Sequence, residues 1–298
     1  MRKVIVFGSL NMDLSIESDH MPTLGETIIG HDFITNPGGK GANQAVAAAK
    51  LGAQVVMLGA VGEDAFGFQM IDALVTHGVQ CDYVSRTSKH PTGVALITRV
   101  QGDNFITIDS GANYFTTTFD ITKALDEIAN PGDAFLCQLE CDFDTTMKAL
   151  TDAHKRSLYT VLNPAPAQKL PGWVLPYLDL VVVNEIECEM LTGTYPVDEE
   201  SARLAMEKLI DEGAGTVVIT LGERGSMVLS QGRMIVEVPP VVQVVDTTCA
   251  GDTYIGALVA AYSRGLSIDD AADLANRASA FATTKVGAQQ SIPSLDEL

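Results

Sequence analysis

The sequence of 298 residues has few positive charges for its length. It contains 19 Lys and Arg against 38 Asp and Glu, which gives a formal net charge of −19. The basic residues form no run, and nucleic acids and anionic membrane surfaces, which bind through clusters of Lys and Arg, are therefore poor partners. The same negative charge would repel a nucleotide. Any phosphate site must rely on backbone N–H groups and on bound cations.

The five cysteines and five histidines are too scattered for a disulfide framework or a zinc site. Cys137 and Cys141 do not have the C-x-x-C spacing, and no H-E-x-x-H motif occurs. A long apolar run is also lacking, since the apolar start at Val4–Phe7 is too short for a signal peptide or a membrane-spanning helix. We therefore expect a cytoplasmic protein.

From about residue 130 onward, short β-branched apolar segments alternate with helical patterns. Such strands are typical of parallel sheets that are covered on both faces. The expected strands are residues 134–139, 159–162, 180–183 and 217–221. The expected helices include residues 42–51, which end at Gly52, and one whose buried face is Ala202, Met206, Leu209 and Ile210. The pattern predicts an open α/β sandwich that binds ligands at the carboxyl ends of its strands.

Two segments, about residues 14–37 and 91–110, interrupt this alternation. Both contain alternating extended patterns with no helix between them, so we expect small antiparallel sheets outside the main sheet. They could form a lid over the ligand cleft or a plain surface ribbon. Both segments run into Gly-rich polar motifs, which favours the lid.

The most informative stretch is Val245-Asp246-Thr247-Thr248-Cys249-Ala250-Gly251-Asp252-Thr253. It is typical of a strand end, a turn of small residues and the start of a helix, whose apolar stripe is Ile255, Leu258, Val259 and Tyr262. The free N–H groups of a helix's first turn favour an anion, and phosphate most of all. Asp252 beside such a site could accept the proton of a hydroxyl that attacks phosphorus. The alternative is that Asp252 only caps the helix.

A second motif is Asn36-Pro37-Gly38-Gly39-Lys40-Gly41-Ala42-Asn43-Gln44. It is not a Walker A loop, because Ile34 and Gly41 stand where that pattern needs Gly and Ser or Thr. The pattern alone therefore does not assign Lys40 to phosphate. Asn43 offers both a donor and an acceptor to sugar hydroxyls, and the alternative is a glycine turn that caps a helix.

Polar side chains also follow several of the expected strands. Asn11 and Asp13 follow the first strand, and Glu140 follows a later one. An Asp that accepts bonds from two hydroxyls is suited to a polyol, whereas an Asx turn is the alternative. Asn184 and Glu187 share a helix face and suit Mg²⁺ that keeps several waters, unless they are only a favourable helix start.

Together these motifs resemble the ribokinase-like family of carbohydrate kinases. The matching segments occur in order along nearly the whole chain: residues 8–13, 38–45, 163–167, 184–187, 246–253 and 287–291. The resemblance implies one ribokinase-like domain over residues 1–298. Its fold would be a three-layer α/β sandwich with a mostly parallel central sheet and a small β-sheet lid.

The resemblance also implies ATP-dependent phosphorylation of a pentose, foremost of D-ribose to D-ribose 5-phosphate. Asp252 would be the base, and the N–H groups of Ala250, Gly251 and Asp252 would form an anion hole. The residues implied for the sugar are Asn11, Asp13, Gly39, Lys40, Asn43, Glu140 and Asp252. Those implied for the nucleotide are Asn184, Thr220, Gly222, Gly225, Gly251 and Asn276.

Two cations follow from the same resemblance. Glu187 would organise Mg²⁺ through water. A monovalent cation, usually K⁺, would bind among Asp246, Thr248, Ala282, Lys285, Gly287 and Ser291. Lys285 could contribute only its backbone carbonyl there. The lid would also join two chains in a homodimer.

Several alternatives remain at this point. A deoxyribokinase would differ by one hydroxyl contact. Met12 lies between the implied sugar ligands and could change the pocket wall, so the substrate stays open. Another sugar kinase of the same family is a further alternative. A non-catalytic sugar or nucleotide sensor would not need the Gly251-Asp252 pair. A dehydrogenase is excluded because no G-x-G-x-x-G follows the first strand. Cys249 stands where the family commonly has Ala or Gly. It could be tolerated as a small apolar residue, or its thiol near the anion hole could make the activity sensitive to oxidation.

Overall fold

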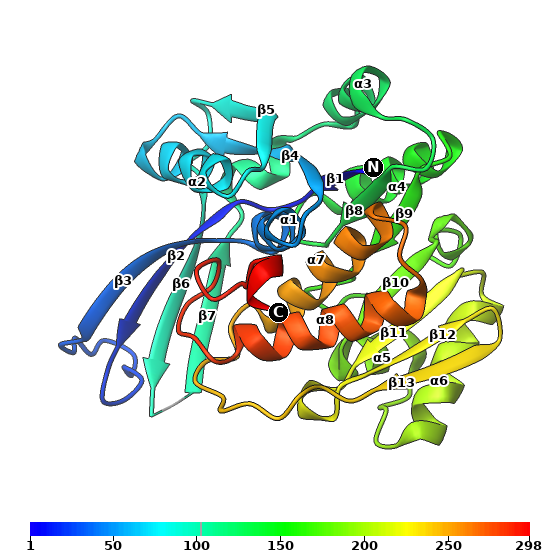
Figure 1. The fold of residues 1–298 in the computed structure, drawn as a ribbon. Coiled ribbons are helices and arrows are strands. Elements are labelled where there is room, and N and C mark those ends of the chain that lie inside the picture. Colours follow the sequence, from blue (N-terminus) through cyan, green and yellow to red (C-terminus); the bar gives the residue numbers. More distant parts are fainter. Residues whose placement is uncertain (102) are drawn as a thin grey trace.

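The computed structural model describes residues 1–101 and 103–298. Its centre is a nine-stranded sheet with the order β13-β12-β11-β10-β9-β8-β1-β4-β5 (Figure 1). The strands from β11 to β5 pair in parallel, whereas β12 and β13 are antiparallel at one edge. The strand bounds are β1 Lys3–Phe7, β4 Gln54–Gly62, β5 Gln80–Thr87, β8 Ala134–Cys137, β9 Tyr159–Leu162, β10 Leu180–Val183, β11 Thr216–Thr220, β12 Ser226–Ser230 and β13 Arg233–Glu237.

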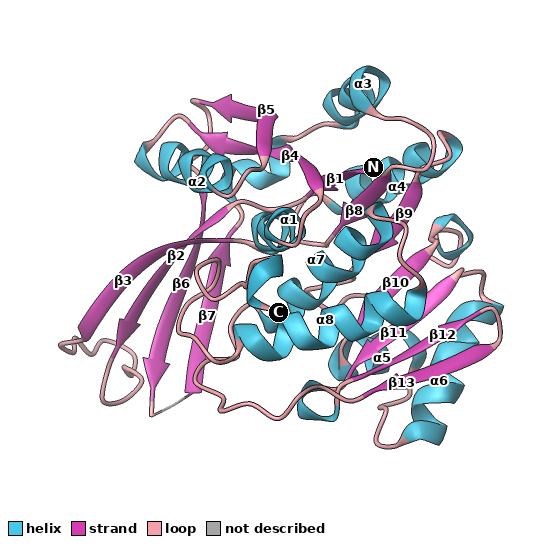
Figure 2. Cartoon of the chain, viewed as in Figure 1, coloured by secondary structure: helices cyan, strands magenta, loops and turns pink. Residues whose placement is uncertain are grey.

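Helices cover both faces of this sheet (Figure 2). Their bounds are α1 Lys40–Lys50, α2 Ala65–Thr76, α3 Thr118–Ile128, α4 Phe143–Lys155, α5 Glu185–Thr192, α6 Glu199–Asp211, α7 Ala250–Ser263 and α8 Ile268–Ala282. Alternate residues of β1 show the reason for two helical layers. Val4 and Val6 pack with α1, α7 and α8, whereas Ile5 and Phe7 pack with α3 and α4 on the other face. The predicted three-layer sandwich is confirmed.

The predicted elements agree with the observed ones except near their ends. The strands expected at residues 159–162 and 180–183 are β9 and β10. The strand expected at 134–139 ends at Cys137, before the residues that lead to Glu140. The helix expected to begin at residue 42 begins at Lys40 instead. No helix in the described part of the chain is both long and apolar enough to span a membrane.

A separate four-stranded sheet extends from the main body, with the order β3-β2-β6-β7 (Figure 1). Its strands are β2 Asn11–Glu17, β3 His31–Gly38, β6 Gly93–Val100 and β7 Asp103–Asp109. The hairpins β2–β3 and β6–β7 are antiparallel, as expected, but β2 and β6 pair in parallel and join them into one sheet. Asn11 and Asp13 therefore lie within β2 and not in a loop after β1.

Candidate active site

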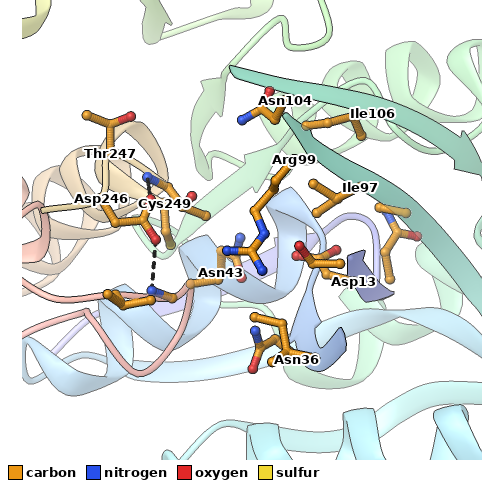
Figure 3. A pocket seen from close by; sticks show the side chains of 18 of the residues that line it. Asp13, Asn36, Asn43, Ile97, Arg99, Asn104, Ile106, Asp246, Thr247 and Cys249 are labelled. Atoms are coloured by element: carbon orange, nitrogen blue, oxygen red, sulfur yellow. Dashed lines mark hydrogen bonds between the residues drawn. The ribbon is translucent and has the colours of Figure 1, made fainter. Parts of the chain in front are cut away.

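Two cavities meet beyond the carboxyl ends of the central strands. The larger one, of about 630 Å³, lies between the four-stranded sheet and the main body (Figure 3). The smaller one has a volume of about 150 Å³ and is lined by residues at or just after the ends of β9, β10 and β11. Lys40, Cys249 and Asp252 line both cavities. Asp252 therefore lies at their junction.

The turn before α7 and the start of the helix form as the sequence predicts, but the expected strand end does not, because β13 ends at Glu237 and residues 238–249 form no strand. Cys249 is the N-cap residue, with a left-handed φ of 67°. In the described part of the chain, the N–H groups of Gly251 and Asp252 have no acceptor, whereas Ala250 donates to the carbonyl of Thr247 at 3.2 Å. A Cβ on Gly251 would meet no atom within 4 Å, so packing does not require glycine there. The free donors and the open space at Gly251 suit an anion in the smaller cavity.

The side chain of Asp252 does not cap α7. Its Oδ2 accepts a hydrogen bond from Asn43 Nδ2 at 3.0 Å, and its Oδ1 accepts one from Gln44 Nε2 at 2.9 Å. Both donors belong to the first turns of α1. The cap interpretation is therefore wrong, and charge-assisted bonds hold the carboxylate at the junction of the cavities.

The glycine turn before α1 brings further polar groups to the larger cavity. Gly39 has a φ of 87°, and a Cβ there would lie 2.7 Å from the backbone nitrogen of Asn11, so only glycine fits. The backbone N–H of Lys40 donates to Glu140 Oε2 at 3.1 Å, and the hydroxyl of Ser9 donates to the same oxygen. The turn thus starts a helix and also orients a buried carboxylate.

The larger cavity contains several carboxylates and one ammonium group. Burial, reinforced by the negative charges of Glu140 and Asp252, raises the pKa of Asp13 to about 7. Burial alone would lower the pKa of Lys40, but the carboxylates of Asp252, Glu140 and Glu187 raise it above its usual value. Lys40 therefore remains charged beside both cavities. The arrangement offers acceptors to hydroxyl groups and a cation to an anionic group.

Asn184 and Glu187 form a capping box at the start of α5. Glu187 N donates to Asn184 Oδ1 at 2.8 Å, and Asn184 N donates to Glu187 Oε2 at 2.9 Å. Both residues also line the smaller cavity with Thr220. Burial raises the pKa of Glu187, although the N–H of Asn184 opposes this. A buried carboxylate with amide oxygens nearby suits Mg²⁺ bound through water, so the capping role and the predicted role are compatible.

Asp246 connects the two loops that are implied for a monovalent cation. Its carboxylate accepts from Thr248 N and from Gly287 N, each at 2.9 Å. These bonds lower the pKa of Asp246 against the raising effect of its burial. The ammonium of Lys285 bonds Glu297 at 2.9 Å, which leaves its backbone carbonyl as the group that could face a cation. The backbone oxygens of these loops are ligands that fit K⁺.

The remaining predicted residues line neither cavity: Ala250, Gly222, Gly225, Asn276, Ala282, Lys285 and Ser291. Asn276 is buried and donates to Ser226 Oγ at 2.8 Å and to the carbonyl of Ala272 at 3.0 Å. Gly225 has a structural reason for its identity, because a Cβ there would lie 2.0 Å from the carbonyl oxygen of Glu237. The nucleotide roles of Gly222, Gly225 and Asn276 stay predictions, as do the anion-hole and cation roles of the other four residues.

The structure adds residues that the sequence motifs did not single out. Asn113 Nδ2 donates to Asn11 Oδ1 at 2.7 Å and so orients that side chain. Gln44 and Asn163 stand inside the quoted motifs, but only the fold shows that they contact each other. Burial and the nearby Asp252 raise the pKa of Cys249 well above its usual value. The thiolate is the reactive form, and this environment disfavours it, but Cys249 also lines both cavities, so its sensitivity to oxidation stays a hypothesis.

The family model described as pfkB family carbohydrate kinase matches residues 1–295. The chain belongs to the pfkB family of carbohydrate kinases. This kinase is 39% identical to ribokinase of Haemophilus influenzae over 299 residues, which cover 100% of this chain and 97% of the relative. It is 36% identical to deoxyribokinase of Salmonella typhi over 298 residues, which cover 99% and 96%.

A solved structure of Arabidopsis thaliana ribokinase, complexed with ribose and ATP, has the same fold. It superposes on this kinase with a TM-score of 0.90 at 31% sequence identity, over 99% of this chain and 96% of that one. The sugar kinase and the ribokinase-like fold predicted from the motifs are therefore confirmed.

The raised pKa of Asp13 predicts a pH dependence of both sugar binding and stability. Only the ionised carboxylate accepts two hydroxyl hydrogens, so the Michaelis constant for the sugar should rise as the pH falls below about 7. At pH values between the usual pKa of 3.8 and about 7, Asp13 is protonated in the folded kinase but ionised in the unfolded chain, so the folded state binds one more proton. Its stability should therefore fall as the pH rises through this range.

Asp13→Asn should remove both effects, although it should also weaken sugar binding at every pH. Denaturant unfolding and steady-state kinetics between pH 5 and 9 would measure them. Asp211→Asn, which changes an exposed carboxylate at the end of α6, is the matched control. An unchanged pH profile in the Asp13 variant would contradict the assignment.

Proposed function

We propose that this kinase transfers the γ-phosphoryl group of ATP to O5 of D-ribose. The observation that carries the proposal is the position of Asp252 at the junction of the two cavities. The larger cavity presents acceptors for hydroxyl groups. The smaller cavity presents free N–H groups and the side-chain oxygens of Asn184 and Glu187, which suit Mg²⁺. The relatives that are ribokinases support the choice of ribose.

On the sugar side, the proposed contacts come from three parts of the fold. Asn11 and Asp13 lie on β2, Gly39 and Asn43 lie at the start of α1, and Glu140 follows β8. Ala95 and Ile97 of β6 add an apolar wall to the same cavity. Carboxylates and amides would bind the hydroxyls, while the aliphatic side chains would cover the C–H face of the ring.

In the proposed step, Asp252 accepts the proton of the O5 hydroxyl as that oxygen attacks the γ-phosphorus. The new O5–P bond forms while the bond to the β–γ bridging oxygen breaks, and ADP leaves. The transition state of phosphoryl transfer is loose, so placement and charge neutralisation carry most of the catalysis. The N–H groups of Gly251 and Asp252 and the ammonium of Lys40 would neutralise the developing charge.

Cations complete the proposal. When bound, Mg²⁺ would neutralise phosphate oxygens, and Glu187 and Asn184 would hold it through water. A monovalent cation, K⁺ in the first instance, would bind beside Asp246 and the loop at Gly287. Because Asp246 bonds both loops, an ion there would stabilise the turn that precedes α7.

We propose further that residues 14–37 and 91–110 form a lid of the single domain and that two copies associate through it. Ile97 and Arg99 line the cavity, so the alternation of β6 places Leu96 on the opposite face of the sheet. Leu96, Phe33 and Phe105 are 52%, 60% and 51% exposed. An apolar face of this kind favours a partner.

All five cysteines are free, which suits the cytoplasm.

The dimer is tested by sedimentation at micromolar concentration. The unchanged kinase should sediment as a dimer, and Leu96→Asp should shift it toward the monomer, because a charge in an apolar interface lacks a partner. Val75→Asp on α2, where the replaced side chain is 56% exposed, is the control and should leave the dimer intact. A monomeric unchanged kinase would overturn the dimer.

The function is tested by ADP release from Mg·ATP with ribose, 2-deoxyribose, fructose and adenosine, each with K⁺ or Na⁺. We expect turnover with ribose that K⁺ stimulates. Asp252→Asn should lower kcat by at least about 100-fold with little change in sugar or ATP affinity, because the variant cannot accept the proton.

Other outcomes of this assay would redirect the assignment. A preference for 2-deoxyribose would keep the mechanism and change the substrate. Sugar binding without ADP release would favour the sensor. Near-normal turnover of Asp252→Asn would contradict the role of the base.

Gly251→Ala tests whether glycine is needed at this position for ligand binding and not for the stability of the fold. A Cβ there meets no atom, so stability should stay the same or increase by about 0.5–1 kcal/mol. The methyl group would enter the smaller cavity, and kcat should fall by about 10-fold or more as the N–H groups lose access to phosphate. Gly172→Ala, which also meets no atom but lines neither cavity, is the matched control. Unchanged turnover of the Gly251 variant would contradict the anion hole.

A further inference from the structure

Gln44 is a fully buried amide at the junction of the two cavities. Its Oε1 accepts a hydrogen bond from Gln138 Nε2 at 2.6 Å. Its Nε2 donates to Asp252 Oδ1 at 2.9 Å and to Asn163 Oδ1 at 3.2 Å. Both hydrogens of the amide are therefore used, one on the proposed base and one on a residue that follows β9.

The network determines the orientation of this amide. Asn163 Nδ2 must face the carbonyl of Val182, at 3.0 Å, because a carbonyl oxygen can only accept. Asn163 Oδ1 then faces Gln44 and needs a donor. A reversed Gln44 amide would place its oxygen against Asn163 Oδ1 and Asp252 Oδ1, which are both acceptors. The orientation in which Gln44 donates to both is therefore the stable one.

The same network continues to the smaller cavity. Asn163 Nδ2 also donates to Glu187 Oε2 at 3.3 Å, and that oxygen accepts the N–H of Asn184. The carboxylate proposed as base and the carboxylate proposed on the magnesium side are thus joined through two buried amides. Gln138, the residue directly after β8, donates to the first of these amides, and a Cβ on Gly8 would lie 2.0 Å from Gln138 Oε1. Gly8 leaves the space that this side chain occupies.

We propose that Gln44 is a positioning residue that couples the orientation of Asp252 to that of Glu187 through Asn163. The inference rests on the kinase function proposed above. Gln44 lines neither cavity, so it acts through Asp252 and not on the substrate. Without its donor, Asp252 would keep only the bond from Asn43 and could rotate away from the attacking hydroxyl. Asn163 would at the same time lose the contact that orients it toward Glu187.

Gln44→Met tests this role, since Met has a similar length and volume but no N–H. We expect kcat to fall about 10- to 100-fold while the Michaelis constants for sugar and ATP change less than about 3-fold, because the loss is one of alignment. Thr146→Val is the control, because it removes the hydrogen bond from a buried hydroxyl to the carbonyl of Asp142 and Thr146 lines neither cavity.

A double-mutant cycle with Glu187→Gln measures the coupling itself. The loss of kcat in the double variant should be smaller than the product of the two single losses, because both changes break one network. Multiplicative losses would overturn the coupling. A decrease in kcat that only follows the fraction of unfolded protein would show a merely structural role and would overturn the proposal. If the unchanged protein shows no sugar-dependent turnover, the proposed function fails and this inference fails with it.

Discussion

The two hydrogen bonds that Asn43 and Gln44 donate to Asp252 join the starts of α1 and α7. The two donors lie 209 and 208 positions before Asp252 in the chain. Both helices pack on the same face of the central sheet, and their N-terminal turns meet where its strands end. The junction of the two cavities depends on this contact. Two amides thus hold one carboxylate where it lines both cavities, which is the position that the proposed transfer from a phosphate to a sugar requires.

The charge of the protein makes local donors necessary. A net charge of −19 repels every anion at long range, so the phosphate side must be built from short-range groups. In the proposed mechanism these groups are the free N–H groups of Gly251 and Asp252 and the ammonium of Lys40, whose charge the surrounding carboxylates stabilise. The sugar side needs no such compensation, because hydroxyl groups donate to carboxylates. Asp13 and Glu140 suit that side for the same reason.

Much of the fold could be predicted from local patterns. The strands β9 and β10 are continuous apolar segments, and the helical period predicts α7, although the structure buries Thr253–Ala261 without interruption and not only one stripe. The turn of small residues before Asp252 also formed as expected. Contacts between distant segments could not be predicted. No local pattern shows that Gln44 donates to Asn163, that β2 pairs with β6 in parallel, or that Asn276 turns toward Ser226.

The sequence by itself determined the α/β class, the order of the motifs and the residue types that can bind a sugar, a phosphate and a cation. These follow from apolar periodicity and from the chemistry of single side chains, and both can be recognised from residues that are close together in the chain. Only the tertiary structure decided that Asp252 is held by α1 and does not cap its own helix. It also decided that the pKa of Asp13 rises to about 7, because burial and two distant carboxylates meet there. Such effects depend on distances across space, which a linear pattern does not contain.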